Sequence, residues 1–231
     1  MKLGDLRRKA QRGTLEVEDL LRAAKARIPG LAEELRSLGR QHKWSASGLL
    51  PDATRVVPLA RWADTASAYA EGGIPALEAL VRDKEYLPFV IALLEELRSQ
   101  EALVALLSLC AEIVKTPSAE PELAWRLATA FNTMLSLKER APATNEQAAA
   151  VRAFLHRLYP LAPDQAKRAL VLLALRGVGD EASLALAKSA ADFEHPWEGV
   201  KATVSAAITK RIRSMGADTA LKRAGDKPPA A

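Results

Sequence analysis

The side chains best suited to acid–base, metal or nucleophilic chemistry are three histidines and one cysteine, scattered along the chain. His42, His156 and His195 lack the spacing of a metal-binding motif such as H-E-x-x-H. Cys110 falls on the apolar face of a very hydrophobic helical stretch, and burial away from cations raises the pKa of a thiol. We therefore expect a buried structural thiol, no metal site and no catalytic residue.

Two further patterns could bind phosphate or pair two carboxylates. The Gly-x-Gly at 177–179 follows a helical sequence and not a strand, it lacks the last glycine of a dinucleotide-binding turn, and no P-loop sequence is present. Adjacent acids such as Glu33 and Glu34 project about 100° apart on a helix, so they cannot face each other. The sequence therefore predicts no cofactor and a protein that is not an enzyme.

Four tryptophans stand out in a chain with only 5% aromatic residues. The first lies in the longest irregular stretch, 43–55, where Gly, Ser, Pro and Asp cluster. The third is followed by an arginine on a predicted helix, within ELAWRLATAF. As candidate contacts to a binding partner we take Trp44, Trp62, Trp125, Arg126 and Trp197.

The formal net charge is a mild +5, but the basic residues gather at the two ends. Residues 1–12 hold five basic residues against one acid, and residues 199–231 hold seven against two. Basic ends can attract polyanions, and the candidate polyanion contacts are Lys201, Lys210, Arg211 and Arg213. On a helical wheel these four form no single basic face, so nucleic-acid binding through the ends is the alternative and not the leading interpretation.

The elements that must position these residues are helices. Apolar residues make up 49% of the chain and are mostly Leu, Ala and Val, while almost no stretch alternates as a strand would. The first residues lack the apolar run of a signal peptide, and no apolar run has the length of a membrane span. One cysteine is compatible with a reducing compartment. We expect an all-α, cytoplasmic protein that does not bind membranes.

Helical periodicity predicts a series of hairpins. The most hydrophobic pairs 86–98 with 101–115, and 121–138 pairs with 145–159, whose start carries a Thr144–Gln147 capping box. After Asp164, an apolar helix ends at Gly177 and Gly179, which we expect to supply left-handed backbone, and Asp180 caps the next helix. First helices begin near residues 86, 121, 164 and 196. Intervals of 35, 43 and 32 residues suit degenerate paired-helix repeats.

The Leu-Arg-Gly-Val-Gly-Asp turn and the spacing of small and branched apolar residues around it resemble HEAT repeats of the short bacterial type. The resemblance implies a right-handed α-solenoid of degenerate HEAT-like hairpins, related to armadillo repeats. We expect a basic segment over 1–13, a single repeat domain over 14–215 and a disordered basic tail over 216–231. Some HEAT-like bacterial proteins are DNA glycosylases, but their aromatic-rich signature is missing here, and Thr129 stands one turn beyond Trp125 where they have an aspartate.

The leading functional hypothesis is therefore a non-enzymatic helical-repeat protein that binds another protein on its concave face. It would act as an adaptor, a scaffold, or an inhibitor of the immunity-protein type, and the Ala-, Arg- and Leu-rich composition favours a bacterial source. The alternative is a nucleic-acid-binding protein, with the HEAT-like DNA glycosylases as its closest analogy.

Overall fold

A computed structural model describes residues 2–42, 59–136 and 143–225, with side chains described as far as Ser214. Every regular element within these ranges is a helix, which confirms the all-α prediction. The chain divides into two compact units, residues 1–109 and residues 110–231. The sequence predicts one repeat domain over 14–215, whereas the structure separates the chain after Leu109.

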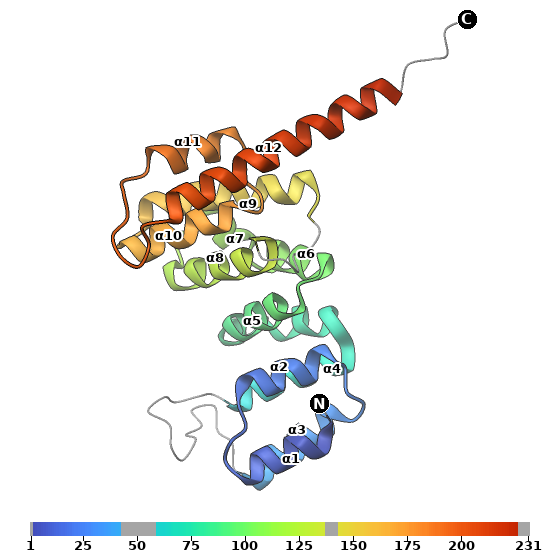
Figure 1. The fold of residues 1–231 in the computed structure, drawn as a ribbon. Coiled ribbons are helices and arrows are strands. Elements are labelled where there is room, and N and C mark those ends of the chain that lie inside the picture. The colour runs from blue at the N-terminus through green and yellow to red at the C-terminus, as the bar shows by residue number, and fades with distance from the viewer. Residues whose placement is uncertain (1, 43–58, 137–142, 226–231) are drawn as a thin grey trace, which may run out of the picture. The chain divides into compact units, whose positions relative to one another are not determined.

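Unit 1 (residues 1–109) is built around its longest helix. Its elements are α1 (Leu3–Gln11), α2 (Val17–Lys25), α3 (Leu31–Gln41), α4 (Leu59–Leu80), the 3-10 turn η1 (Lys84–Tyr86), α5 (Leu87–Leu97) and α6 (Gln100–Leu109). α4 packs against α2 and α3 and also against α5 and α6, while α1 packs on α3 (Figure 1). Helices α3 and α4 therefore share a long surface, with α2 and the turn that follows it at one end.

The basic N-terminal segment is helical, and two of its cations are paired with buried carboxylates. Arg7 donates from Nε and Nη2 to the Glu34 carboxylate at 2.6 and 2.5 Å, and Lys9 Nζ donates to both oxygens of Asp19 at 2.7 Å. Glu34 is 7% exposed and Asp19 only 1%. A buried carboxylate is costly unless it is paired, so these basic residues fix α1 to α2 and α3.

Helix α4 is broken at the Gly72–Gly73 pair. Gly73 has φ 64° and ψ −149°, a conformation that residues with a Cβ rarely adopt. Pro75 then stands in the first turn of the continuing helix, where a missing N–H costs little. The kink turns the end of α4 toward η1 and α5.

The most hydrophobic hairpin forms between α5 and α6, as predicted. Six of its side chains are fully buried: Val90, Ile91, Leu93, Leu94, Leu103 and Leu106. The expected helix over 101–115 is interrupted, because α6 ends at Leu109 and the next helix begins at Ala111. Among the described residues, no helix combines the length and the apolar character needed to span a membrane.

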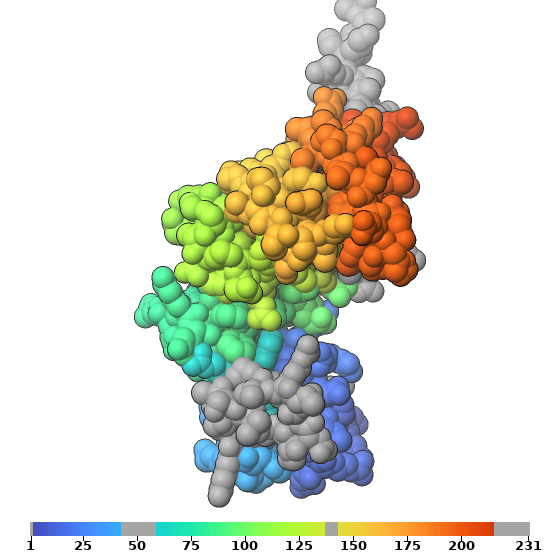
Figure 2. Space-filling model, turned by 90° about the vertical axis from the view of Figure 1, so that its left-hand side faces the viewer, coloured from blue at the N-terminus to red at the C-terminus, as the bar shows by residue number. Residues whose placement is uncertain are grey.

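Unit 2 (residues 110–231) arranges its helices in two rows. Its elements are α7 (Ala111–Lys115), α8 (Pro121–Ser136), α9 (Asn145–Leu158), the 3-10 turn η2 (Tyr159–Leu161), α10 (Gln165–Leu175), α11 (Glu181–Ser189) and α12 (Val200–Gly225). In one row α10 lies between α8 and α12; in the other, α9 contacts α7 and bonds to α11 through side chains (Figure 1). Figure 2 shows the lime, orange and red segments of unit 2 following one another across its surface. Consecutive helices thus alternate between the rows, as in paired-helix repeats.

Two predicted helix caps in unit 2 are confirmed. Thr144 Oγ1 accepts from the Gln147 amide at 3.2 Å, while Gln147 Oε1 accepts from the Thr144 amide at 2.8 Å, which completes the capping box. Asp180 Oδ1 accepts from the Ser183 amide at 3.0 Å and starts α11. The backbone of α12 continues helically to Gly225, into the stretch that the sequence predicts as a tail.

The expected role of Gly177 and Gly179 is wrong. Within the described residues, positive φ among glycines occurs at Gly13, Gly30 and Gly73, and neither of the two is among them. Glycine is needed at these two positions because neighbouring helices leave no room for a Cβ atom. A Cβ on Gly177 would lie 1.9 Å from the Leu135 carbonyl oxygen, and one on Gly179 would lie 2.8 Å from the Ile208 side chain. Glycine therefore stands at both positions because α8 and α12 approach this turn closely.

Candidate partner-binding surface

Cys110 has the environment of a structural thiol. It is 1% exposed, and burial raises the pKa of its thiol to about 12. A thiol with that pKa is almost entirely protonated at neutral pH, and the thiolate is the reactive form. The prediction of a buried thiol is confirmed, but Cys110 is the N-cap residue of α7, after the end of α6, and does not lie on a helix face.

A Ser–His–Asp cluster in unit 2 deserves comparison with a catalytic triad. Ser183 Oγ donates to Asp180 Oδ1 at 3.1 Å, and His156 Nε2 lies 2.9 Å from the same hydroxyl oxygen. In a triad the histidine stands between the acid and the serine and takes the serine proton. Here the serine stands in the middle and directs its proton to the carboxylate, so the histidine is not its base.

Burial also argues against catalysis at this cluster, because Ser183 has 0% exposure and no substrate can reach it. Burial lowers the pKa of His156, which outweighs the opposite effect of Asp180. Burial opposes ionisation of Asp180, but hydrogen bonds from Ser183 and the charge of Arg152 bring its pKa below the usual value. Arg152 bonds to the Val178 carbonyl at 2.8 Å and to Asp180 at 3.0 Å. The cluster therefore joins α9 to the start of α11.

The other two histidines lie apart from it. His42 follows the end of α3, and exposed His195 pairs through Nδ1 with Glu198 at 3.2 Å. In the part of the chain that the structure describes, no group of three or more His, Cys, Asp or Glu side chains could hold a metal ion.

Two of the tryptophan candidates are nearly buried, each within its own unit. Trp62, in unit 1, is 9% exposed and packs edge-on against Phe89 at 5.0 Å between ring centroids. Trp125, in unit 2, is 8% exposed, and Lys167 Nζ lies 5.4 Å from its ring centroid. Trp197 is half-buried in the turn before α12. Arg126 is exposed on α8, and Trp44 lies outside the described residues.

The candidate polyanion contacts on α12 differ in how accessible they are. Lys201 Nζ is held by the Ala190 carbonyl at 2.9 Å and by Asp192 at 3.2 Å. Arg211 is half-buried, whereas Lys210 and Arg213 are exposed. Of the four, Lys210 and Arg213 are therefore the most accessible, and the prediction from the helical wheel stays a prediction.

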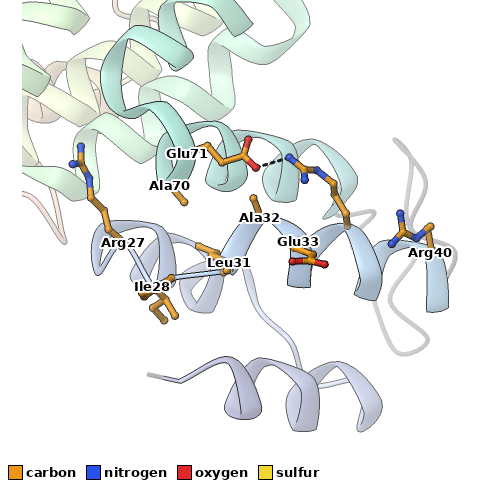
Figure 3. Close-up of a pocket in the computed structure, with 11 residues that line it drawn as sticks. Arg27, Ile28, Leu31, Ala32, Glu33, Arg40, Ala70 and Glu71 are labelled. Carbon is orange, nitrogen blue, oxygen red and sulfur yellow. Dashed lines mark hydrogen bonds and ion pairs between the residues drawn. The ribbon is translucent and has the colours of Figure 1, made fainter.

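A trough runs along α3 in unit 1. A first cavity of about 590 Å³ lies between α3, the turn before it and α4 (Figure 3). A second, of about 430 Å³, adjoins it farther along α3 and shares Arg36 and Arg40 with it. We call the two together the α3 trough, lined by Arg27, Ile28, Pro29, Gly30, Leu31, Ala32, Glu33, Leu35, Arg36, Gly39, Arg40, Ala60, Ala63, Asp64, Ser67, Ala70 and Glu71.

Both signs of charge line the α3 trough. Arg36 Nη2 donates to Glu71 Oε1 at 2.6 Å across its middle. Figure 3 shows Arg27 and Arg40 at opposite ends of the first cavity, with Glu33 and Glu71 between them. Among the described residues, neither the Arg27 nor the Arg40 side chain has a hydrogen bond or ion pair, although the Arg27 guanidinium lies 5.0 Å from the Tyr69 ring centroid. The trough therefore has paired charges at its centre and, at its ends, two guanidinium groups that no described carboxylate pairs with.

The lining residues of the α3 trough that the structure describes carry charged and small apolar side chains and include no His, Cys or Lys. Small residues, four alanines and two glycines among them, line the trough between the charged side chains: Gly30, Ala32, Gly39, Ala60, Ala63 and Ala70.

Sequence reasoning missed this surface. The local signal was present, because Arg36 and Arg40 are one turn apart on α3 and Glu33 stands one turn before Arg36. This charge pattern is common on solvated helices. It indicates a binding surface only once α4 places Ala70 and Glu71 opposite α3, and Glu71 lies 35 positions after its partner Arg36.

Comparison of the chain with protein-family models, with curated protein sequences and with solved structures found no match in any of the three.

Proposed function

We propose that this chain is a non-enzymatic helical-repeat protein that binds another protein, and that the α3 trough of unit 1 is its binding surface. The observation that carries the proposal is the lining of the trough: arginines and carboxylates in equal number over small apolar residues. Sites for small molecules are mostly apolar, with a few convergent polar groups. Arginine is instead enriched at protein–protein interfaces, whose rims are polar.

The alternating rows of helices in unit 2 support the HEAT-like part of the proposal. α8, α10 and α12 follow one another in one row and α7, α9 and α11 in the other, as stacked helix pairs require. Such proteins bind large partners on extended surfaces, in roles such as adaptor, scaffold or inhibitor of the immunity type. The cytoplasmic location and bacterial source stay predictions from composition.

Nucleic acid is the weaker alternative, because several basic residues near the two ends of the chain already have hydrogen-bond or ion-pair partners within the fold. Arg7 and Lys9 neutralise buried carboxylates, and Lys201 is bonded to α11 and the residues after it. The tryptophan rings that could stack on bases are nearly buried at Trp62 and Trp125.

The test is steric occlusion of the trough without any change of charge. Ala70 is half-exposed and lines the first cavity, so Ala70→Trp fills the cavity while α4 keeps its packing. Ala79→Trp is the matched control, since Ala79 is exposed on the same helix and lies outside the lining. Both variants should melt near the wild-type temperature by circular dichroism.

We expect a pull-down from a nuclease-treated lysate of the source cells to recover one stoichiometric protein with the wild type and with Ala79→Trp. Ala70→Trp should reduce that recovery at least tenfold. Equal recovery with both variants would show that the partner binds elsewhere, and recovery of nucleic acid alone would refute protein binding as the function.

A further inference from the structure

We infer that the partner of the α3 trough is a polypeptide that places one carboxylate on Arg27 and a second on Arg40. This inference rests on the proposed function and specifies the chemistry of the same site. Two arginines without a carboxylate partner among the described residues stand at the two ends of a cavity whose central arginine is already paired. A ligand gains most where charge is available and unpaired, which is at those two ends.

Arg27 is held in place by its surroundings. Its backbone has φ 45°, and it closes α2 by donating from its amide to the Ala24 carbonyl at 2.8 Å. Glycine is favoured at this position of a helix end, so an arginine there is conspicuous. Its guanidinium stacks over Tyr69, and a Cβ on Gly73 would lie 2.9 Å from Arg27 Nη2. The Tyr69 ring and Gly73, which has no side chain, thus position the Arg27 guanidinium. Its N–H groups can then donate to a carboxylate of the partner.

Arg40 supplies the second contact. It is exposed in the last turn of α3 and lines both cavities. From the start of α3 at Leu31 to Arg40 the helix rises about 13.5 Å. An extended polypeptide covers this part of α3 in about four or five residues. Arg27 lies four positions before Leu31, so a peptide that spans α3 between the two arginines carries its carboxylates about five or more positions apart.

The carboxylates in the trough select a polypeptide over a nucleic acid. Glu33, Glu71 and Asp64 lie along the same lining as the arginines. A nucleic-acid strand carries one phosphate about every 3.4 Å and would place several of them against these acids. A polypeptide can place acids at the two ends and neutral residues between them.

The probe is a fluorescein-labelled Gly/Ser peptide with two glutamates five positions apart, and its control replaces both glutamates with glutamine. Binding is measured by fluorescence anisotropy to the full chain at low salt. We expect the glutamate peptide to bind at least tenfold more tightly than the glutamine peptide. Arg27→Gln and Arg40→Gln should each weaken it about fivefold, and the double variant about 25-fold if the sites are independent. Arg22→Gln, exposed on α2 outside the lining, is the matched control and should bind as the wild type does.

Equal binding of the two peptides, absence of binding by the glutamate peptide, or indifference to Arg27→Gln and Arg40→Gln would each overturn the inference. Tighter binding of a twelve-nucleotide thymidine strand, lost in the same variants, would overturn it in favour of phosphate recognition. The proposed function has a separate readout: if Ala70→Trp still abolishes capture of the lysate protein, the trough binds a protein by other chemistry. If neither the arginine variants nor Ala70→Trp alters that capture, both proposals fail.

Discussion

Replacing Gly177 with alanine tests the packing of unit 2 at its closest approach. The added Cβ would lie 1.9 Å from the Leu135 carbonyl oxygen and 2.5 Å from the carbonyl carbon. Carbon–oxygen contacts normally begin near about 3.3 Å, so the two backbones must separate by about 1.4 Å. No rotamer change can relieve this contact, because the obstructing atoms belong to the backbone at the end of α8.

The expected cost follows from that geometry. Overpacking a core costs about 1–3 kcal/mol where side chains can adjust, and a backbone obstacle places this variant near the upper end. Alanine also has less conformational freedom than glycine in the unfolded chain, which offsets the cost by about 0.4–1 kcal/mol. We therefore expect Gly177→Ala to lower the free energy of unfolding of unit 2 by about 2–3 kcal/mol, and its melting temperature by about 10 °C.

The assay is urea unfolding followed by far-ultraviolet circular dichroism, with Gly199→Ala as the matched control. A Cβ on Gly199 meets no heavy atom within 4 Å, so this variant should stay within about 0.5 kcal/mol of the wild type. If Gly177→Ala unfolds at the same urea concentration as Gly199→Ala, the argument that glycine is there to admit the Leu135 carbonyl is refuted.

Two further predictions concern charge. The pKa of His156 is lowered in the folded protein from 6.5, so below pH 6.5 the unfolded chain takes up the proton first; stability is retained above that pH and falls as the pH drops below it. Urea midpoints from pH 8 to 5 should show this slope, and His156→Gln should flatten it; an equal slope in the variant would exclude His156 as the cause. Asp19→Asn removes the carboxylate that Lys9 pairs with at 1% exposure, and should cost about 1–2 kcal/mol in the same assay. The comparison variant Glu18→Gln, at an exposed carboxylate on the same helix, should leave the urea midpoint nearly unchanged, and equal effects of the two would contradict the importance of burial.

Local features of the fold were predictable because their causes lie within a few residues. The Thr144–Gln147 capping box and the Asp180 cap each join groups three positions apart, and both form as expected. The break of α4 at Gly73 follows from a backbone conformation that glycine tolerates. Composition and periodicity predicted an all-helical chain because Leu and Ala favour helices over their whole length.

The roles that individual residues have in the tertiary structure were harder to predict from the sequence. Gly177 was correctly placed in a turn, but its purpose depends on the Leu135 carbonyl 42 positions earlier in the chain. The basic N-terminal residues look like a solvated end until Arg7 meets Glu34 and Lys9 meets Asp19. Helical periodicity identifies a charged face, but it does not identify the partner that the face meets.

The sequence by itself determined that this chain is helical, where several of its helices begin and break, and that Cys110 is a buried thiol. Those properties depend on local backbone preference and on the number of apolar residues, and both can be inferred from the amino-acid sequence alone. Only the tertiary structure decided the division into two units and the α3 trough. A trough between helices exists because side chains such as Arg36 and Glu71 from distant positions meet across it, and that meeting depends on how the helices pack and not on either helix alone.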